Sequence, residues 1–408
     1  MAEALEPLLP EVCSFAQLTE VLSAAAVARH WRQASRSDQV WIQCCRQRWH
    51  FGRLFEVEES LDPGARDEAS LRLWQRSVEE YKAGVKHERA FGFFLGRCKK
   101  DEEVRQLLQQ AVQDVTKREE ILQQLPQMGA NILDILLKLE AGQDAKLRSA
   151  ARLARIQITD AWAQQRWAHL IKVEPAKAAV LEEGAFVLSQ WGYPAADVHR
   201  MRQTLEQLAA RATQLGARRE GEGVPTQAEV RRMVGALNQA LYQEFGLAGN
   251  QSDYYNPENS MLHAVLMNKK GIPISLSVVW AAVAGRCGLV CHPLANVPRH
   301  VLIRIPARAE SGPAETQDMY LDAFDHGQLM DWPQLRDFLL DLLGLGMVGH
   351  EVHLPQFVAI TPPALLYLRM MRNLENIYGQ TGDTVRLQGI QLQMRTLIRL
   401  CEEGGGGY

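Results

Sequence analysis

The spacing of apolar residues changes along the chain, and this change constrains the fold more than any other feature. From residue 70 to residue 211, apolar side chains recur at helical intervals, as in Leu107, Leu108, Ala111 and Val115, which is typical of packed amphipathic helices. Beyond Gly288 apolar and polar residues alternate instead, as they do in half-buried strands. The sequence therefore predicts a mostly helical α+β fold.

The C-terminal half should contain one central helix and a small antiparallel sheet. Pro273 suits the first turn of a helix and Gly288 suits a helix end, so an apolar helix is expected over 275–286. A polar, Gly-rich loop at 216–226 should precede this half. The remaining expected elements are strands over 290–297, 300–305 and 319–324, and helices over 332–343, 363–378 and 383–401, the last two as an αα-hairpin.

Charge and composition exclude several classes of partner. Lys and Arg number 45 against 48 for Asp and Glu, so the chain has no long-range field that would gather nucleic acid. The most apolar stretches, such as 278–284, are far shorter than the roughly 20 residues that cross a bilayer. The N-terminus is acidic, unlike a secretory or organellar leader. We expect a cytoplasmic or nuclear protein with no nucleic-acid or membrane partner.

The cysteines indicate neither a disulfide framework nor a zinc site. Cys287 and Cys291 are four residues apart, but no further Cys or His pair follows at ligand spacing. We expect reduced thiols, no metal and no cofactor. The seven cysteines lie at positions 13, 44, 45, 98, 287, 291 and 401.

Several separated motifs between residues 148 and 401 carry a family resemblance. The motifs are Tyr255, Asn256 and Pro257 with Asn259 and Ser260, then Gly271 to Leu276, then Pro298, His300 and Asp322. Together they resemble the SirB family of the transglutaminase-like superfamily. The run 181–208 resembles the helical leader of that family, and 366–378 resembles its tetratricopeptide-like hairpin. The resemblance implies a transglutaminase-like helix-plus-antiparallel-sheet core.

The N-terminal segment carries a second resemblance. Leu9 and Pro10, the stretch 27–31 and the stretch 38–49 are similar to the opening, the centre and the closing helix of an F-box. The span between Pro10 and Val27 is about one helical turn shorter than in that family. The tryptophans of this segment fit the core of the small helical unit better than contact with an adaptor. The residues that the resemblance assigns to adaptor binding are Leu9, Pro10, Leu18, Val21, Val27, Trp31 and Trp41.

These patterns divide the chain into five expected parts. They are an F-box-like three-helix unit at 1–52, a helical array with the SirB-type leader at 70–215, a transglutaminase-like core at 227–345, a tetratricopeptide-like hairpin at 360–402 and a flexible tail at 403–408.

The resemblance also identifies a candidate catalytic centre and predicts that it is inactive. The family motif places a cysteine two residues after the glycine, and here that position is Pro273, which has no nucleophile. His300 and Asp322 take the places of the family's histidine and aspartate, and we expect a hydrogen bond between them in a vestigial pair. Ser275 could present a hydroxyl instead, although a capping or packing role suits it better.

A polar and aromatic cluster precedes the predicted helix. Tyr254, Tyr255, Asn256 and Asn259 have a composition suited to ligand contact and equally to a turn with Asx capping. Both interpretations stand at this point. The full candidate cleft is Tyr255, Asn256, Asn259, Ser275, His300 and Asp322.

The leading functional hypothesis is a non-catalytic substrate-recognition adaptor of an SCF-type ubiquitin ligase. The F-box resemblance implies binding to the Skp adaptor and, through it, to the cullin scaffold, while the SirB-type body would hold client proteins whose identity the sequence does not give. One alternative is an active cysteine- or serine-type transamidase or hydrolase. Another is a helical interaction scaffold with no link to ubiquitin.

Overall fold

A computed structural model gives the structure of the chain. The predicted F-box-like unit at 1–52, with all of its adaptor-binding residues, lies outside the described residues. By Cα proximity the chain divides into two compact units, Met1–Trp162 and Ala163–Tyr408. The residues described are 89–128, 132–173, 181–218, 221, 223–308, 318–344, 354 and 356–403.

The described part of the first unit is entirely helical, as the apolar spacing predicts. Its core contains the fully buried Leu108, Ile132 and Leu136. Arg155 adds a partly buried ion pair to Glu140. The elements are α8 (Arg89–Gln113), α9 (Arg118–Gln124), η2 (Leu125–Met128), α10 (Leu133–Glu140) and the first part of α11 (Ala145–Lys172).

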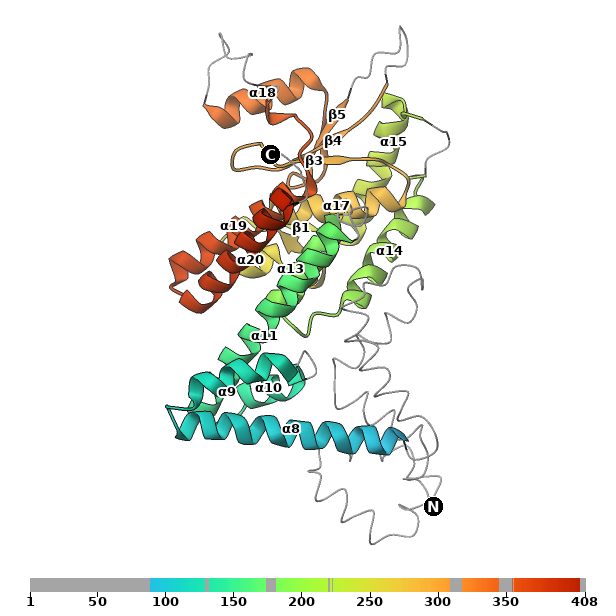
Figure 1. Cartoon of the computed structure of the whole chain (residues 1–408). Helices are drawn as coiled ribbons and strands as arrows, with labels where there is room; N and C mark the ends of the chain where they lie inside the picture. The colour runs from blue at the N-terminus through green and yellow to red at the C-terminus, as the bar shows by residue number, and fades with distance from the viewer. Residues whose placement is uncertain are drawn as a thin grey trace, which may run out of the picture. The chain divides into compact units, whose positions relative to one another are not determined.

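The second unit is built around one buried helix, α17 (Pro273–Arg286). Every residue from Pro273 to Ala284 is buried, so this helix is apolar on all sides, as expected for a helix inside a core. Gly288 follows it with φ 83 and ends it as predicted. Two helices, α13 (Leu181–Gly192) and α14 (Val198–Gln214), and two strands, β3 (His292–Leu294) and β4 (Leu302–Ile305), pack against α17 (Figure 1). The surrounding helices are α13 (Leu181–Gly192), α14 (Val198–Gln214), α15 (Gln227–Asn238), the π-helix η4 (Gln239–Glu244), the 3-10 helix η5 (Pro257–Ser260) and α16 (Leu262–Asn268).

The predicted antiparallel sheet is present with shorter strands and one additional strand. Its order is β3-β4-β5-β6, with all neighbours antiparallel and Ile303 paired to Leu321. A separate parallel pair, β1 (Ala248–Gly249) and β2 (Lys270–Gly271), lies just before α17. The four strands are β3 (His292–Leu294), β4 (Leu302–Ile305), β5 (Met319–Asp322) and β6 (Gln328–Met330).

All three predicted strands extend too far. The segment expected as a strand over 290–297 is a strand only at His292–Leu294, because the chain turns from residue 295 onward. The segment expected as a strand from 300 begins pairing only at Leu302, because Arg299 has a left-handed backbone with φ 58 and the chain is still turning at His300. The segment expected to end at Phe324 stops at Asp322, whose carboxylate accepts backbone N–H groups and starts a turn instead.

The helices after the sheet agree closely with the sequence prediction. Helix α18 (Trp332–Leu343) has the predicted bounds, begins with a capping box between Asp331 and Gln334, and packs on β5 and β6. Helices α19 (Pro363–Thr381) and α20 (Thr384–Glu403) lie side by side as the predicted αα-hairpin (Figure 1). No helix in the described ranges combines the length and the apolar character needed to cross a membrane.

Candidate functional site

The first residue of α17 is a proline, and the serine of its first turn is used for capping. Pro273 is its first residue, and the preceding Ile272 donates its backbone N–H to Ser275 Oγ at 3.1 Å. Ser275 Oγ in turn donates to the carbonyl of Asn259 at 2.6 Å, and its residue is 1% exposed. Ser275 is therefore a capping residue that ties the helix start to the preceding turn, which confirms the capping interpretation.

His300 and Asp322 form the predicted hydrogen bond. His300 Nε2 lies 2.8 Å from Asp322 Oδ2. The other carboxylate oxygen of Asp322 accepts the backbone N–H groups of Phe324 at 2.9 Å and Asp325 at 3.3 Å. Asp322 is only 3% exposed, so water hardly reaches its carboxylate. The His300 ring and the two backbone N–H groups supply the hydrogen bonds that the buried carboxylate needs. This arrangement fixes the orientation of the imidazole.

Aromatic side chains and α17 fix the position of His300. Its ring meets Phe324 edge-on at 6.2 Å between centroids and Phe338 at 5.6 Å. The carbonyl of the next residue, Val301, lies 3.5 Å from Ser277 Oγ, and Ser277 is one turn beyond Pro273. The backbone that follows His300 therefore lies against the N-terminal half of α17.

The loop before His300 is held by the C-terminal hairpin. Arg369, on α19, donates Nη1 to the carbonyl of Ala295 at 2.6 Å and to that of Val297 at 2.7 Å. Burial lowers the pKa of Arg369. The hairpin therefore helps to shape the turn that presents the imidazole.

A second group of side chains holds the turn after Asp322. Tyr242, in η4, donates its hydroxyl to the carbonyl of Ala323 at 2.8 Å, and Asn238 donates to the carbonyl of Gly327 at 2.7 Å. Burial and the nearby charge of Asp322 raise the pKa of Tyr242, so the phenol remains a donor. The sequence reasoning missed both residues. Tyr242 lies in a π-helix, which has no clear sequence signal although such turns often occur near functional sites, and Asn238 is the last residue of α15.

The cysteines near the end of α17 do not replace the missing nucleophile. Cys287 lies fourteen residues beyond Pro273, which is roughly 20 Å along a helix. Its thiol contacts the carbonyl of Ala209 at 3.6 Å, and burial raises its pKa. Burial, with a smaller contribution from the charge of Glu182, raises the pKa of Cys291 to about 12. Both thiols are therefore kept protonated and poorly reactive.

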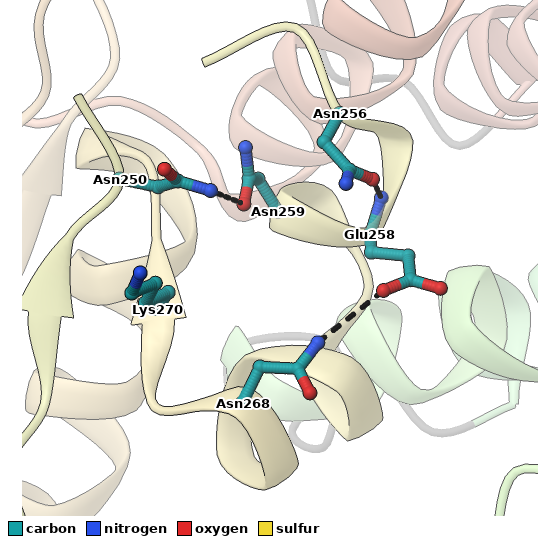
Figure 2. A pocket seen from close by; sticks show the side chains of 6 residues that line it. All are labelled: Asn250, Asn256, Glu258, Asn259, Asn268 and Lys270. Atoms are coloured by element: carbon teal, nitrogen blue, oxygen red, sulfur yellow. Dashed lines mark hydrogen bonds between the residues drawn. The ribbon is translucent and has the colours of Figure 1, made fainter. Parts of the chain in front are cut away.

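The structure does not bring the six predicted cleft residues together in one cavity. A polar cavity of about 320 Å³ is lined by Asn256 and Asn259, whereas Tyr255, Ser275, His300 and Asp322 do not line it. Tyr255 is exposed and meets the neighbouring Tyr254 edge-on at 5.4 Å. Figure 2 shows the lining residues, which are Asn250, Asn256, Glu258, Asn259, Asn268 and Lys270. Sequence reasoning missed four of these six.

Asn256 and Asn259 also confirm the turn interpretation. Asn256 Oδ1 accepts the backbone N–H of Glu258 at 2.9 Å and caps η5. Asn259 Nδ2 donates to the carbonyls of Asp253 at 2.7 Å and Tyr254 at 3.1 Å. The same two residues cap the turn and line the cavity. Their role in the turn is therefore compatible with contact to a ligand. In the part of the chain that the structure describes, no group of His, Cys, Asp and Glu side chains could hold a metal ion.

Comparisons with known proteins find similarity over part of the chain. Residues 199–372 match the family model of the transglutaminase-like superfamily. A UPF0162 protein of Xylella fastidiosa (strain 9a5c) is 34% identical over 151 residues, which are 36% of this chain and 50% of that protein. F-box only protein 21 of Homo sapiens is 37% identical over 98 residues, which are 24% of this chain and 15% of that protein.

The chain thus spans about half the length of the UPF0162 protein and a much smaller part of F-box only protein 21. No solved structure matches the chain. The matched range includes all of α17, the sheet, His300 and Asp322. The chain therefore contains a transglutaminase-like domain.

Proposed function

We propose that this chain is a non-catalytic substrate-recognition adaptor of an SCF-type ubiquitin ligase, and that its SirB-type transglutaminase-like domain binds the client proteins. The clients remain unidentified, and the conjugation chemistry belongs to other subunits. The protein would work in the cytoplasm or nucleus.

The observation that carries the non-catalytic part is Pro273. Transglutaminase-type chemistry needs a thiolate at the start of a helix, beside an imidazole that a carboxylate orients. The imidazole and the carboxylate are here, hydrogen-bonded at 2.8 Å, but the helix starts with proline. Ser275 is committed to capping and cannot easily release its hydroxyl.

The adaptor part has separate support. F-box only protein 21 is similar to this chain over 98 residues, and residues 9–49 resemble an F-box. Together these favour binding to the Skp adaptor, and to the cullin scaffold through it. No specific observation favours the alternative of an active transamidase or hydrolase. If the chain does not bind the Skp adaptor, the remaining hypothesis is a helical interaction scaffold without a link to ubiquitin.

The test of the adaptor part is co-purification of the full chain with the Skp adaptor and the cullin. A variant with Leu9→Asp and Leu18→Asp should lose both partners, because charges at these positions oppose an apolar interface. The matched control places the same change at Val115 and Val173, which are 76% and 51% exposed. Failure of the unmodified chain to capture the adaptor contradicts the proposal, as does equal capture by the variant with Leu9→Asp and Leu18→Asp.

A further inference from the structure

The polar cavity holds two opposite charges that do not neutralise each other. Lys270 contributes an ammonium and Glu258 a carboxylate. Among the described residues no ion pair joins these two groups, and the Lys270 ammonium has no hydrogen-bond acceptor. Glu258 accepts instead from Asn268 Nδ2 at 3.3 Å and lies 3.5 Å from the hydroxyl of Tyr193. Both charges are thus available to a ligand.

Buried carboxamides line the same cavity. Asn250 and Asn259 are 8% and 4% exposed, and Asn250 Nδ2 donates to Asn259 Oδ1 at 2.9 Å (Figure 2). Asn250 is fixed further, since its backbone N–H donates to Gly271 at 2.8 Å and its Oδ1 accepts from Asp253 at 3.1 Å. The carboxamides are therefore preorganised, which lowers the entropic cost of binding.

The next lysine has a different environment. Lys269 Nζ lies 5.0 Å from the centre of the Phe245 ring, a cation–π contact that engages its charge within the fold. Lys269 does not line the cavity. The two adjacent lysines thus differ, because the charge of Lys270 has no partner among the described residues.

We propose that this cavity binds a small zwitterion of dipeptide size, with its ammonium against Glu258 and its carboxylate against Lys270. A ligand with one positive and one negative charge can pair with both Glu258 and Lys270. A purely anionic ligand would place a negative charge near the Glu258 carboxylate, which would repel it. The volume of about 320 Å³ is at the low end for small-molecule sites, which suits a short ligand. The carboxamide of Asn268 is suited to the central amide of the ligand, since only one of its Nδ2 hydrogens is used, in the bond to Glu258. This site does not depend on the adaptor proposal.

The ligand side of the test uses diglycine and three relatives in calorimetric titrations of the full chain. N-acetyl-diglycine lacks the ammonium, diglycine amide lacks the carboxylate, and 5-aminopentanoate keeps both charges at the same chain length without the amide. We expect diglycine to bind about tenfold more tightly than either blocked form, and 5-aminopentanoate to bind less tightly than diglycine.

The protein side uses three single variants. Lys270→Met and Glu258→Gln should each weaken diglycine binding about tenfold, because each removes one charge-assisted contact. Lys269→Met is the matched control, since it removes the neighbouring charge outside the cavity and should leave the affinity unchanged. Thermal melts of all three should show that the fold persists.

Several results overturn the proposal. One is the absence of saturable diglycine binding, and another is equal affinity for the free and the blocked forms, which would indicate a site for peptide backbone. Unchanged affinity after Lys270→Met, or equal losses after Lys269→Met and Lys270→Met, would show that Lys270 has no specific role.

Discussion

Nε2 of His300 lies 2.8 Å from Oδ2 of Asp322, while α17 begins with Pro273, a residue without a nucleophilic side chain. The pair is embedded in its surroundings. Phe324 and Phe338 flank the imidazole, and the carboxylate accepts two backbone N–H groups. These contacts give the pair a structural role that needs no catalysis.

The first prediction concerns that structural role. Asp322→Ala should lower the free energy of unfolding by about 3 kcal/mol, because it leaves three donors unsatisfied around a buried site. Asp322→Asn should cost less, since its carbonyl oxygen still accepts from the backbone of Phe324 and Asp325. Urea denaturation of both variants checks the order. Equal stability of Asp322→Ala and the unmodified chain would show that these hydrogen bonds contribute nothing.

Ser275 provides a second prediction. Ser275→Ala should destabilise the fold by about 1 to 2 kcal/mol, since it removes the acceptor for the Ile272 N–H and the donor to the Asn259 carbonyl. Thr384 is the first residue of α20, and Thr384→Ala serves as a comparison at another helix start. A Ser275→Ala variant with unchanged denaturation midpoint would argue against the capping role.

The thiol of the half-buried Cys291 predicts a dependence of stability on alkaline pH. Burial raises its pKa from 9.0 to about 12 in the folded chain. A group whose pKa is raised by folding stabilises fully below its unfolded pKa, and this contribution is lost as the pH rises toward the folded value. Between pH 9 and 12 the unmodified chain should therefore lose more stability than Cys291→Ala. Denaturation midpoints of both proteins across this pH range measure the difference. Parallel curves of stability against pH for the two proteins would contradict the prediction.

The contact between α13 and α19 predicts a contrast between two helical glycines. A Cβ added at Gly184 would lie 2.4 Å from Cε1 of Tyr367, so Gly184→Ala should cost about 1 to 3 kcal/mol through overpacking. At Gly379 no atom lies within 4 Å of such a Cβ. Gly379→Ala should therefore be neutral or stabilise the helix by up to about 1 kcal/mol. Thermal melts that show equal effects at both sites would contradict this packing.

The sequence predicts the fold well where local signals are strong. Helix α18 has its predicted bounds, because Asp331 and Gln334 form a capping box that the sequence itself contains. The αα-hairpin is equally local, with Gly382 at φ 69 between its helices. The His300–Asp322 bond was predictable only through the family resemblance, since 22 residues separate the partners.

The parts that sequence reasoning missed depend on tertiary contacts. Strands β1 and β2 have two residues each and pair across a gap of some twenty residues, so no periodicity marks them. The cavity residues Asn250, Asn268 and Lys270 come together only through that pairing and the turn of η5. Their polar composition alone indicates an ordinary loop.

The central claim is that the transglutaminase-like domain lacks covalent chemistry because Pro273 occupies the nucleophile position. Its most direct test is incorporation of a fluorescent amine donor into a glutamine-containing peptide by the purified full chain, beside its His300→Ala variant and an active transglutaminase. We predict no incorporation above buffer for either form of this chain. Robust turnover that His300→Ala abolishes would contradict the account, because it would show that the pair still serves a nucleophile.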